Sequence, residues 1–147
     1  MDYEELLKRL APCGLDCMRC ADYQNGEIKQ LAMRLKELLS NYGRVAKVKS
    51  RLDSVFEHYA HFETVLTLFS QAPCGGCRSS RPVCPVPCAA GDCHKEKGVD
   101  FCFQCEEYPC ENPTFPVLKD RWRQKNDRMR EIGVIEFYDE QSKSPRY

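Results

Sequence analysis

Hydrophobic residues recur at helical spacing over most of the chain. Between residues 22 and 42, and again between residues 45 and 69, apolar side chains return every three or four positions. Spacing of this kind places the apolar side chains on one face of an α-helix. The two stretches therefore predict an antiparallel helical hairpin at about residues 24–70. We expect Gly43 to supply the left-handed cap of its first helix, and we allow for a break near residues 58–61.

The second of these stretches has an unusually regular apolar seam. Its members alternate between steps of three and four, and they are Val45, Val48, Leu52, Val55, Tyr59, Phe62, Leu66 and Phe69. A seam of this kind is typical of helix–helix contact. A neighbouring helix of the same chain can cover it, which is the arrangement we favour. A dimeric coiled coil is the alternative.

Three further helical patterns lie outside the hairpin. Residues 2–10 are predicted to form a short helix. Residues 113–132 form a longer pattern that begins with an Asn-Pro cap and ends at Gly133. Residues 134–141 add one or two amphipathic turns, and residues 142–147 are expected to be disordered. Because no stretch alternates like a long strand, we predict a mainly α fold.

The segment from Cys74 to Cys110 follows neither periodicity. It holds eight of the eleven cysteines within 37 residues, together with eight glycines and prolines that interrupt helices and strands. Its few large apolar side chains cannot offset the entropy of ordering it by burial alone. We therefore expect an irregular, cross-linked segment, with the hairpin and the C-terminal helix packed around it.

Composition favours metal ions over disulfides as the cross-links. The 22 basic residues balance the 22 acidic ones, so net charge indicates no polyanionic partner. The N-terminal residues are too charged for a signal peptide, and no apolar run is long enough for a membrane span. We therefore expect a cytoplasmic protein with no membrane partner, and cytoplasmic thiols stay reduced. Eleven cysteines also cannot all form pairs.

Three pairs of cysteines have the spacing C-x2-C, which lets two thiolates from one turn reach the same metal ion. They are Cys17/Cys20, Cys74/Cys77 and Cys102/Cys105. We expect all the cysteines to be metal ligands: Cys13, Cys17, Cys20, Cys74, Cys77, Cys84, Cys88, Cys93, Cys102, Cys105 and Cys110. Zinc, with two or more ions, is the favoured cofactor. An iron–sulfur cluster is the alternative, because both take four thiolates.

The cysteines divide into three candidate ligand sets. The two later C-x2-C pairs, at residues 74/77 and 102/105, are expected to close one tetrahedral site. The cysteines at 84, 88, 93 and 110 are candidates for a second site. The N-terminal cluster at 13, 17 and 20 lacks an evident fourth ligand, and a site that is short of one protein ligand is typical of an exchangeable position.

The cysteine pattern resembles a known family. The residues that carry the resemblance are Ala11-Pro-Cys-Gly-Leu-Asp-Cys17, Cys20, Tyr23, Cys74-Gly-Gly-Cys-Arg78, Cys84, Cys88, Cys93, Glu96-Lys-Gly-Val99, Cys102, Cys105 and Tyr108-Pro-Cys110. Together they are similar to a cysteine-rich prokaryotic family of proteins of unknown function described as zinc-binding. The resemblance covers most of the chain and implies metal binding, but it implies no reaction. In one departure, three residues separate Cys84 from Cys88 where the family often has two, so whether this pair shares one ion stays open.

We interpret residues 1–147 as a single domain. Residues 1–73 are its helical part with the N-terminal cysteine cluster. Residues 74–110 are the cysteine-rich metal-binding lobe, and residues 111–147 carry the C-terminal helices.

The leading functional hypothesis is a binding or interaction module in which zinc is a structural staple. Its candidate surface for a protein or nucleic-acid partner is Lys119–Arg130, with six basic residues, two acidic ones and Trp122. Such a surface suits a phosphate backbone and one stacked base. The plainer interpretation is that Trp122 lies in the core, because it falls on the apolar stripe of its helix.

The alternative hypothesis is a metalloenzyme or an iron–sulfur redox protein. It would use an open metal position at Cys13, Cys17 and Cys20. Asp16 is the nearest acid or base candidate, although it also suits a turn.

Overall fold

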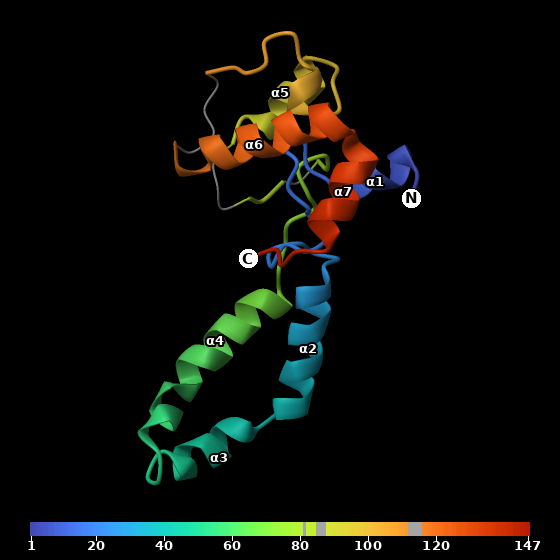
Figure 1. Ribbon diagram of the computed structural model, residues 1–147. Helices are drawn as coiled ribbons and strands as arrows, with labels where there is room; N and C mark the ends of the chain where they lie inside the picture. Colours follow the sequence, from blue (N-terminus) through green and yellow to red (C-terminus); the bar gives the residue numbers. More distant parts are fainter. Residues whose placement is uncertain (81, 85–87, 112–115) are drawn as a thin grey trace.

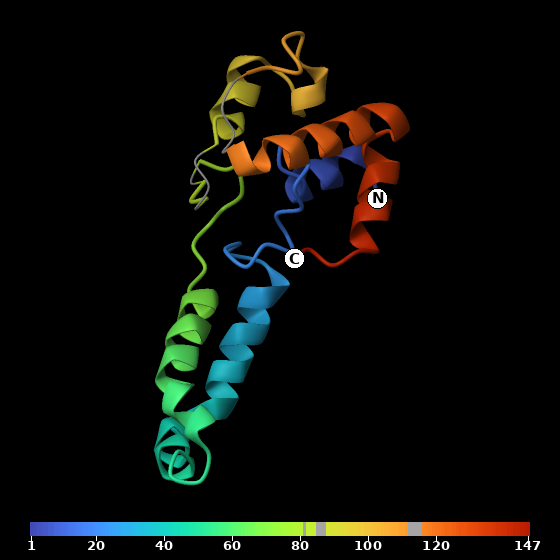
Figure 2. The same ribbon diagram turned by 60° about the vertical axis from the view of Figure 1, so that its left-hand side comes forward.

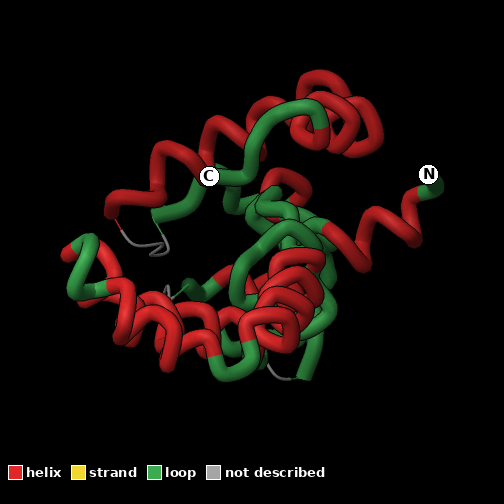
Figure 3. Tube along the Cα trace, turned by 90° about the horizontal axis from the view of Figure 1, so that it is seen from below, coloured by secondary structure: helices red, strands yellow, loops and turns green. Residues whose placement is uncertain are grey.

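Helices are the regular elements of this protein, as its computed structural model shows (Figures 1 and 3). The structure describes residues 1–80, 82–84, 88–111 and 116–147, with only the backbone described for residues 116–118. The α-helices over these residues are α1 (Tyr3–Arg9), α2 (Glu27–Leu39), α3 (Tyr42–Lys49), α4 (Tyr59–Ser70), α5 (Ala90–Glu96), α6 (Pro116–Ile132) and α7 (Val134–Ser142). Two 3-10 helices, η1 (Ser54–His58) and η2 (Cys102–Gln104), complete them. The prediction of a mainly α fold is confirmed.

The helices form two parts, which we call the arm and the head. The arm (residues 27–70) contains α2, α3, η1 and α4. In it, α2 and α4 run antiparallel and α3 lies at the far end (Figures 1 and 2). The head (residues 1–26 and 71–147) contains the other helices and the cysteine-rich segment. The predicted hairpin is therefore present, and it projects away from the cysteines.

The turns of the arm differ from those that we predicted. The residue with positive φ after α2 is Ser40, at φ 41°, whereas Gly43 lies inside α3. The prediction of Gly43 as a cap is therefore wrong, because the next helix has already begun at Tyr42. The second helical stretch is interrupted after Ser50, where the Asp53 carboxylate accepts a hydrogen bond of 3.0 Å from the Val55 amide and starts η1.

Few side chains of the arm are buried. They are Ala32, Ala46 and Leu66, one from each α-helix. Of the predicted seam only Leu66 is buried, and Leu52, for example, is 88% exposed. Most of the seam therefore lies outside the contact between the two long helices. Coverage of the seam by a second copy of the chain stays a prediction.

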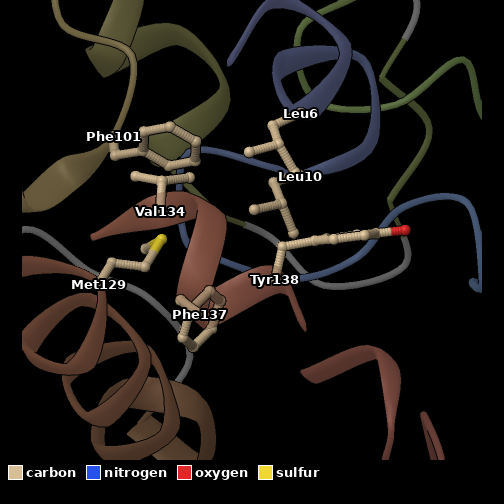
Figure 4. Close-up of a cluster of buried hydrophobic side chains, with 7 residues drawn as sticks. All are labelled: Leu6, Leu10, Phe101, Met129, Val134, Phe137 and Tyr138. Carbon is tan, nitrogen blue, oxygen red and sulfur yellow. The ribbon is translucent and has the colours of Figure 1, made fainter. Parts of the chain in front are cut away.

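The head has a core of seven buried side chains (Figure 4). They come from α1, α6, α7 and the segment before η2, and they are Leu6, Leu10, Phe101, Met129, Val134, Phe137 and Tyr138. Arg78 connects two of these elements. Its Nε donates to the Leu10 carbonyl at 3.0 Å, and its guanidinium carbon lies 4.9 Å from the centre of the Phe101 ring. Phe103 also packs against this core, so two aromatic rings and one arginine attach the cysteine-rich segment to it.

The C-terminal end of the head is ordered, so the prediction of disorder for residues 142–147 is wrong. Gly133, with φ 85°, turns the chain from α6 into α7 as predicted. Beyond α7, the Ser144 carbonyl accepts a hydrogen bond from Arg19 at 2.7 Å, and the Tyr147 hydroxyl accepts one from the Ala21 amide at 2.9 Å. Polar groups of the N-terminal cysteine loop therefore hold the last residues in place.

The long C-terminal helix that the sequence predicted is α6. The predicted cap at residues 112 and 113 lies outside the described residues, and α6 begins at Pro116. None of the helices in the described parts of the chain is both long and apolar enough to cross a lipid bilayer.

Candidate metal centre

Most of the cysteines gather in the head, in two neighbouring groups. Nine lie close enough to another thiol to influence its pKa or be influenced by it: Cys13, Cys17, Cys77, Cys84, Cys88, Cys93, Cys102, Cys105 and Cys110. Six of them belong to or pack against a small apolar cluster that contains Ala11, Ala90 and Trp122: Cys13, Cys17, Cys77, Cys88, Cys102 and Cys110. No disulfide bond joins any two cysteines of the described structure. Segments that are far apart in the sequence thus bring their thiols together.

The first group is built on a contact between Cys17 and Cys77. The Cys17 sulfur accepts hydrogen bonds from the thiol and from the backbone amide of Cys77, and the thiol bond is the main reason that the pKa of Cys17 falls to about 7. The same bond, followed by burial, raises the pKa of Cys77 well above its usual range. Burial raises the pKa of the adjacent Cys13 to about 12. A bound metal cation would stabilise all three as thiolates.

The second group is built around Cys102. Burial raises the pKa of this thiol to about 11, against the opposing effect of a hydrogen bond with the Trp122 indole. The other thiols of the group interact with Cys102 or with one another, and they are Cys88, Cys93, Cys105 and Cys110. Burial is also the main reason that the pKa of Cys93 is raised.

Backbone amides point at the sulfurs of Cys13 and Cys74. The Gly76 amide donates to the Cys74 sulfur at 3.4 Å, and the Leu15 amide acts on the Cys13 thiol so as to oppose the rise in its pKa. In both cases the donor is two residues after the cysteine. Hydrogen bonds of this kind stabilise and orient thiolates that are bound to a metal.

The other two C-x2-C pairs also lie in tight turns. The Cys20 amide donates to the Cys17 carbonyl at 3.0 Å, and the Cys105 amide donates to the Cys102 carbonyl at 3.1 Å. A turn of this size keeps both cysteines of a pair at one corner of the chain. The backbone therefore has the local form that each pair needs to act as a two-ligand unit.

The grouping of the thiols in space differs from the pairing that we expected. The thiols that act most strongly on Cys77 are Cys17, Cys13 and Cys84. The pair at residues 102 and 105, its expected partner, belongs to the second group, and Cys13 connects the two groups because its thiol also interacts with Cys88 and Cys102. Proximity thus couples the Cys74/Cys77 turn to the N-terminal cluster.

Cys20 and Cys74 lie at the junction of head and arm. Cys74 forms an isolated β-bridge with Tyr23. The sulfur of Cys20 lies 3.9 Å from the Asp22 carboxylate and 3.7 Å from the Tyr147 hydroxyl. Cys20 thus faces the C-terminal residues, whereas Cys17 faces Cys77.

Over the described residues, no three His, Cys, Asp or Glu side chains converge as the ligands of one metal ion do. Metal binding by the eleven cysteines therefore stays a prediction. Cys17, Cys20, Cys102 and Cys105 lie in tight turns, and rotation about χ1 moves each sulfur among three staggered positions. Such rotations are the change that metal binding would require.

Two polar residues near the cysteines have structural contacts. Asp16 is fully buried, and its carboxylate accepts hydrogen bonds from the Met18 amide at 3.0 Å and from Arg19 Nε at 2.7 Å. These contacts agree with a turn-forming role for Asp16. His94, which follows Cys93, is buried with its Nδ1 2.8 Å from the Ala90 carbonyl oxygen, and burial lowers its pKa.

The cysteines lie within a region that matches a known protein family. The family model described as "Protein of unknown function (DUF3795)" matches residues 9–114, well over half of the chain. The chain belongs to the DUF3795 family. The resemblance to a cysteine-rich family of unknown function is thereby confirmed. No curated protein and no solved structure matches the chain. The DUF3795 match contains the arm and all eleven cysteines, whereas α6 and α7 follow it.

The candidate partner surface on α6, Lys119–Arg130, lies outside the DUF3795 match. It is less suited to binding a nucleic acid than its sequence suggested. Trp122 is 6% exposed, so it is not available to stack on a base. Lys119 and Arg128 have carboxylate partners at 2.8 Å, in Glu111 and Glu131. The plainer interpretation of this helix, with its tryptophan in the core, is the correct one.

Two residues of the head escaped the sequence analysis. Asn126 is fully buried, where it accepts a hydrogen bond from the Phe103 amide at 3.0 Å and donates one to the Trp122 carbonyl at 3.0 Å. Its position in phase with Trp122 and Met129 on α6 was the available signal. Arg146 influences Cys17 electrostatically, and no sequence pattern places it there because the tail docks only through tertiary contacts.

Proposed function

We propose that this chain is a cytoplasmic zinc-binding module whose cysteines hold two or more zinc ions as structural staples. The observation that supports the proposal best is the amide-to-sulfur hydrogen bond at Cys74, in a C-x2-C turn of the kind that metal-binding knuckles have. The gathering of thiols from distant segments supports it further. Zinc suits this donor set because thiolate sulfur is its preferred ligand in closed structural sites.

A structural role fits the place of the thiols in the fold. The cysteine-rich segment contributes Phe101 to the head core, and Arg78 attaches it to α1, but its remaining stretch has few apolar anchors. Zinc at the thiol groups would connect this stretch to the N-terminal loop and to η2. Our hypothesis also includes binding to a partner. That binding would depend on surfaces whose positions the zinc sites fix.

The alternative, an open catalytic or redox site at Cys13, Cys17 and Cys20, has less support. The Cys20 sulfur lies against Tyr147, and the close thiol neighbour of Cys17 is Cys77. We therefore propose the structural role.

Elemental analysis of anaerobically purified protein, with its visible spectrum, tests the metal. We expect at least two equivalents of zinc and a colourless protein. A brown protein that contains iron and sulfide would favour an iron–sulfur cluster, and a protein without bound metal would contradict the proposal.

Removal of one ligand tests the structural role. Cys77→Ser or Cys105→Ser should lower the zinc content and unfold the cysteine-rich segment. A structural zinc site contributes about 10–16 kcal/mol, against a total stability of about 5–15 kcal/mol. Ser80→Ala, at an exposed position of the same segment, is the control. If both cysteine variants melt within a degree or two of the parent, these residues are not structural ligands.

A further inference from the structure

A pocket of about 260 Å³ lies beside α6, α7 and the C-terminal residues, and cations dominate its wall. Four of its nine lining residues are basic: Arg19, Arg121, Lys125 and Arg146. Glu140 is the acidic residue among them. The volume is slightly below that of typical small-molecule sites, roughly 300–1,000 Å³.

Most of this positive charge has no acidic partner. Arg19 pairs with Asp16 at 2.7 Å, and Glu140 pairs with Arg128 at 2.5 Å. Over the described residues, no carboxylate oxygen lies within 4.0 Å of a charged nitrogen of the other three basic residues of the wall. Three positive charges therefore share one small pocket.

Two buried donors of the same pocket also have no acceptor. They are Nε of Arg146 and Nε2 of Gln141, in the part of the chain that the structure describes. The orientation of the Gln141 amide is fixed, because Lys125 can only donate and its Nζ lies 2.5 Å from Gln141 Oε1. Buried donors without acceptors are rare in folded proteins, and an ion that is not part of the chain is one explanation.

We propose that this pocket binds a small phosphate-bearing anion, with Arg121, Lys125 and Arg146 as its cationic ligands. A phosphate monoester carries about two negative charges at neutral pH and three acceptor oxygens, which suits several cations and two free N–H donors. A carboxylate carries one charge and would leave most of the positive charge uncompensated. Arginine is well suited to phosphate because its guanidinium can donate two parallel hydrogen bonds.

Two further features of the pocket agree with this assignment. Burial, followed by the charges of Arg146 and Arg121, lowers the pKa of Lys125, as expected for a cation without its counter-ion. Phe137 and Pro145 also line the pocket, so part of the wall is apolar and could contact an organic group attached to the phosphate. The inference is independent of metal binding at the cysteines.

Calorimetric titration of the metal-loaded protein with inorganic phosphate, glycerol phosphate and acetate tests the proposal. Ionic strength is held constant with chloride, because surface electrostatics are screened by salt. We expect saturable binding of at least one phosphate probe, and at least tenfold weaker binding of acetate. Tighter binding of glycerol phosphate would identify a phosphomonoester as the ligand, and equal binding would identify the phosphate group alone. Zinc content measured after each titration excludes extraction of metal as the source of the heat.

Substitutions at two cations on one helix supply the decisive comparison. Arg121 and Arg130 are both exposed on α6, but only Arg121 lines the pocket. Loss of a charge-assisted hydrogen bond should make Arg121→Gln and Lys125→Gln bind phosphate about tenfold more weakly or worse. Arg130→Gln should stay within about twofold of the parent. The proposal is overturned by an absence of saturable phosphate binding, by acetate binding as tight as phosphate binding, or by equal losses at Arg121 and Arg130.

Discussion

Arg19 lies against the fully buried carboxylate of Asp16, with its Nε 2.7 Å from Oδ2. Its other two nitrogens donate to backbone carbonyls, those of Gln141 in the last turn of α7 and of Ser144 just beyond it. One side chain thus neutralises a buried charge and holds the C-terminal residues against the N-terminal cysteine loop.

Replacement of Arg19 should therefore be costly. Arg19→Met leaves the Asp16 carboxylate with only the Met18 amide as a partner, and removal of one member of a buried pair costs about 3–5 kcal/mol. We expect a melting temperature roughly 10 °C lower in phosphate-free buffer. Arg34→Met is the control, since its pair with Glu37 is exposed and should contribute less than about 1 kcal/mol. Equal effects of the two substitutions would contradict this role of Arg19.

Gly14 should not tolerate a side chain. Its φ is 80°, and an added Cβ would lie 2.8 Å from Met129 Cε and 3.1 Å from Lys125 Cβ. Met129 is fully packed in the head core, so it has little room to move. We expect Gly14→Ala to lower the free energy of unfolding by about 2–4 kcal/mol in urea titrations, from backbone strain and overpacking together.

Gly98→Ala separates these two causes. Gly98 has φ 64°, but an added Cβ there would meet nothing within 4 Å. This variant should lose only the backbone contribution, about 1–2 kcal/mol. If Gly98→Ala loses as much free energy of unfolding as Gly14→Ala, then crowding against α6 does not contribute to the loss at Gly14.

Leu66 should carry much of the packing between α2 and α4. It is 6% exposed, whereas Leu68 on the same helix is 64% exposed. Leu66→Ala should lower the free energy of unfolding by about 2–4 kcal/mol. Its helical circular dichroism signal should therefore be lost at a lower temperature than that of the parent. Leu68→Ala should stay within about 0.5 kcal/mol. The opposite order would contradict this role of Leu66 and would mean that a partner in solution buries Leu68.

His94 should make stability fall as the pH drops. Burial lowers its pKa in the folded protein below the ordinary value of 6.5. As the pH falls through 6.5, the unfolded chain gains a proton on this imidazole before the folded chain does, so the folded state loses stability. Urea unfolding at pH 7.5 and pH 5.5 should show a smaller loss for His94→Gln than for the parent. His61→Gln, at an exposed site, should match the parent, and any loss of metal at low pH would affect all three proteins alike.

The sequence by itself determined most of the helices outside the cysteine-rich segment. Periodic apolar residues predicted helices in the arm and at the C-terminus, because local spacing decides which side of a helix can be buried. Gly133 was identifiable as a turn, since its conformation suits glycine. The density of cysteines marked the segment from residue 74 to residue 110 as one that burial alone cannot order.

Only the tertiary structure decided which groups meet. The seam of the arm was regular in sequence, but α2 and α4 pack through Ala32 and Leu66 and leave most of it exposed, because facing positions depend on how two helices are rotated about their axes. The contact between Cys17 and Cys77 joins residues 60 positions apart, and no local pattern encodes it. The C-terminal residues looked disordered because their anchors, Arg19 and the Ala21 amide, lie at the other end of the chain. The cationic pocket is hidden in the sequence for the same reason: it requires α6, α7 and the N-terminal loop to be brought together in space.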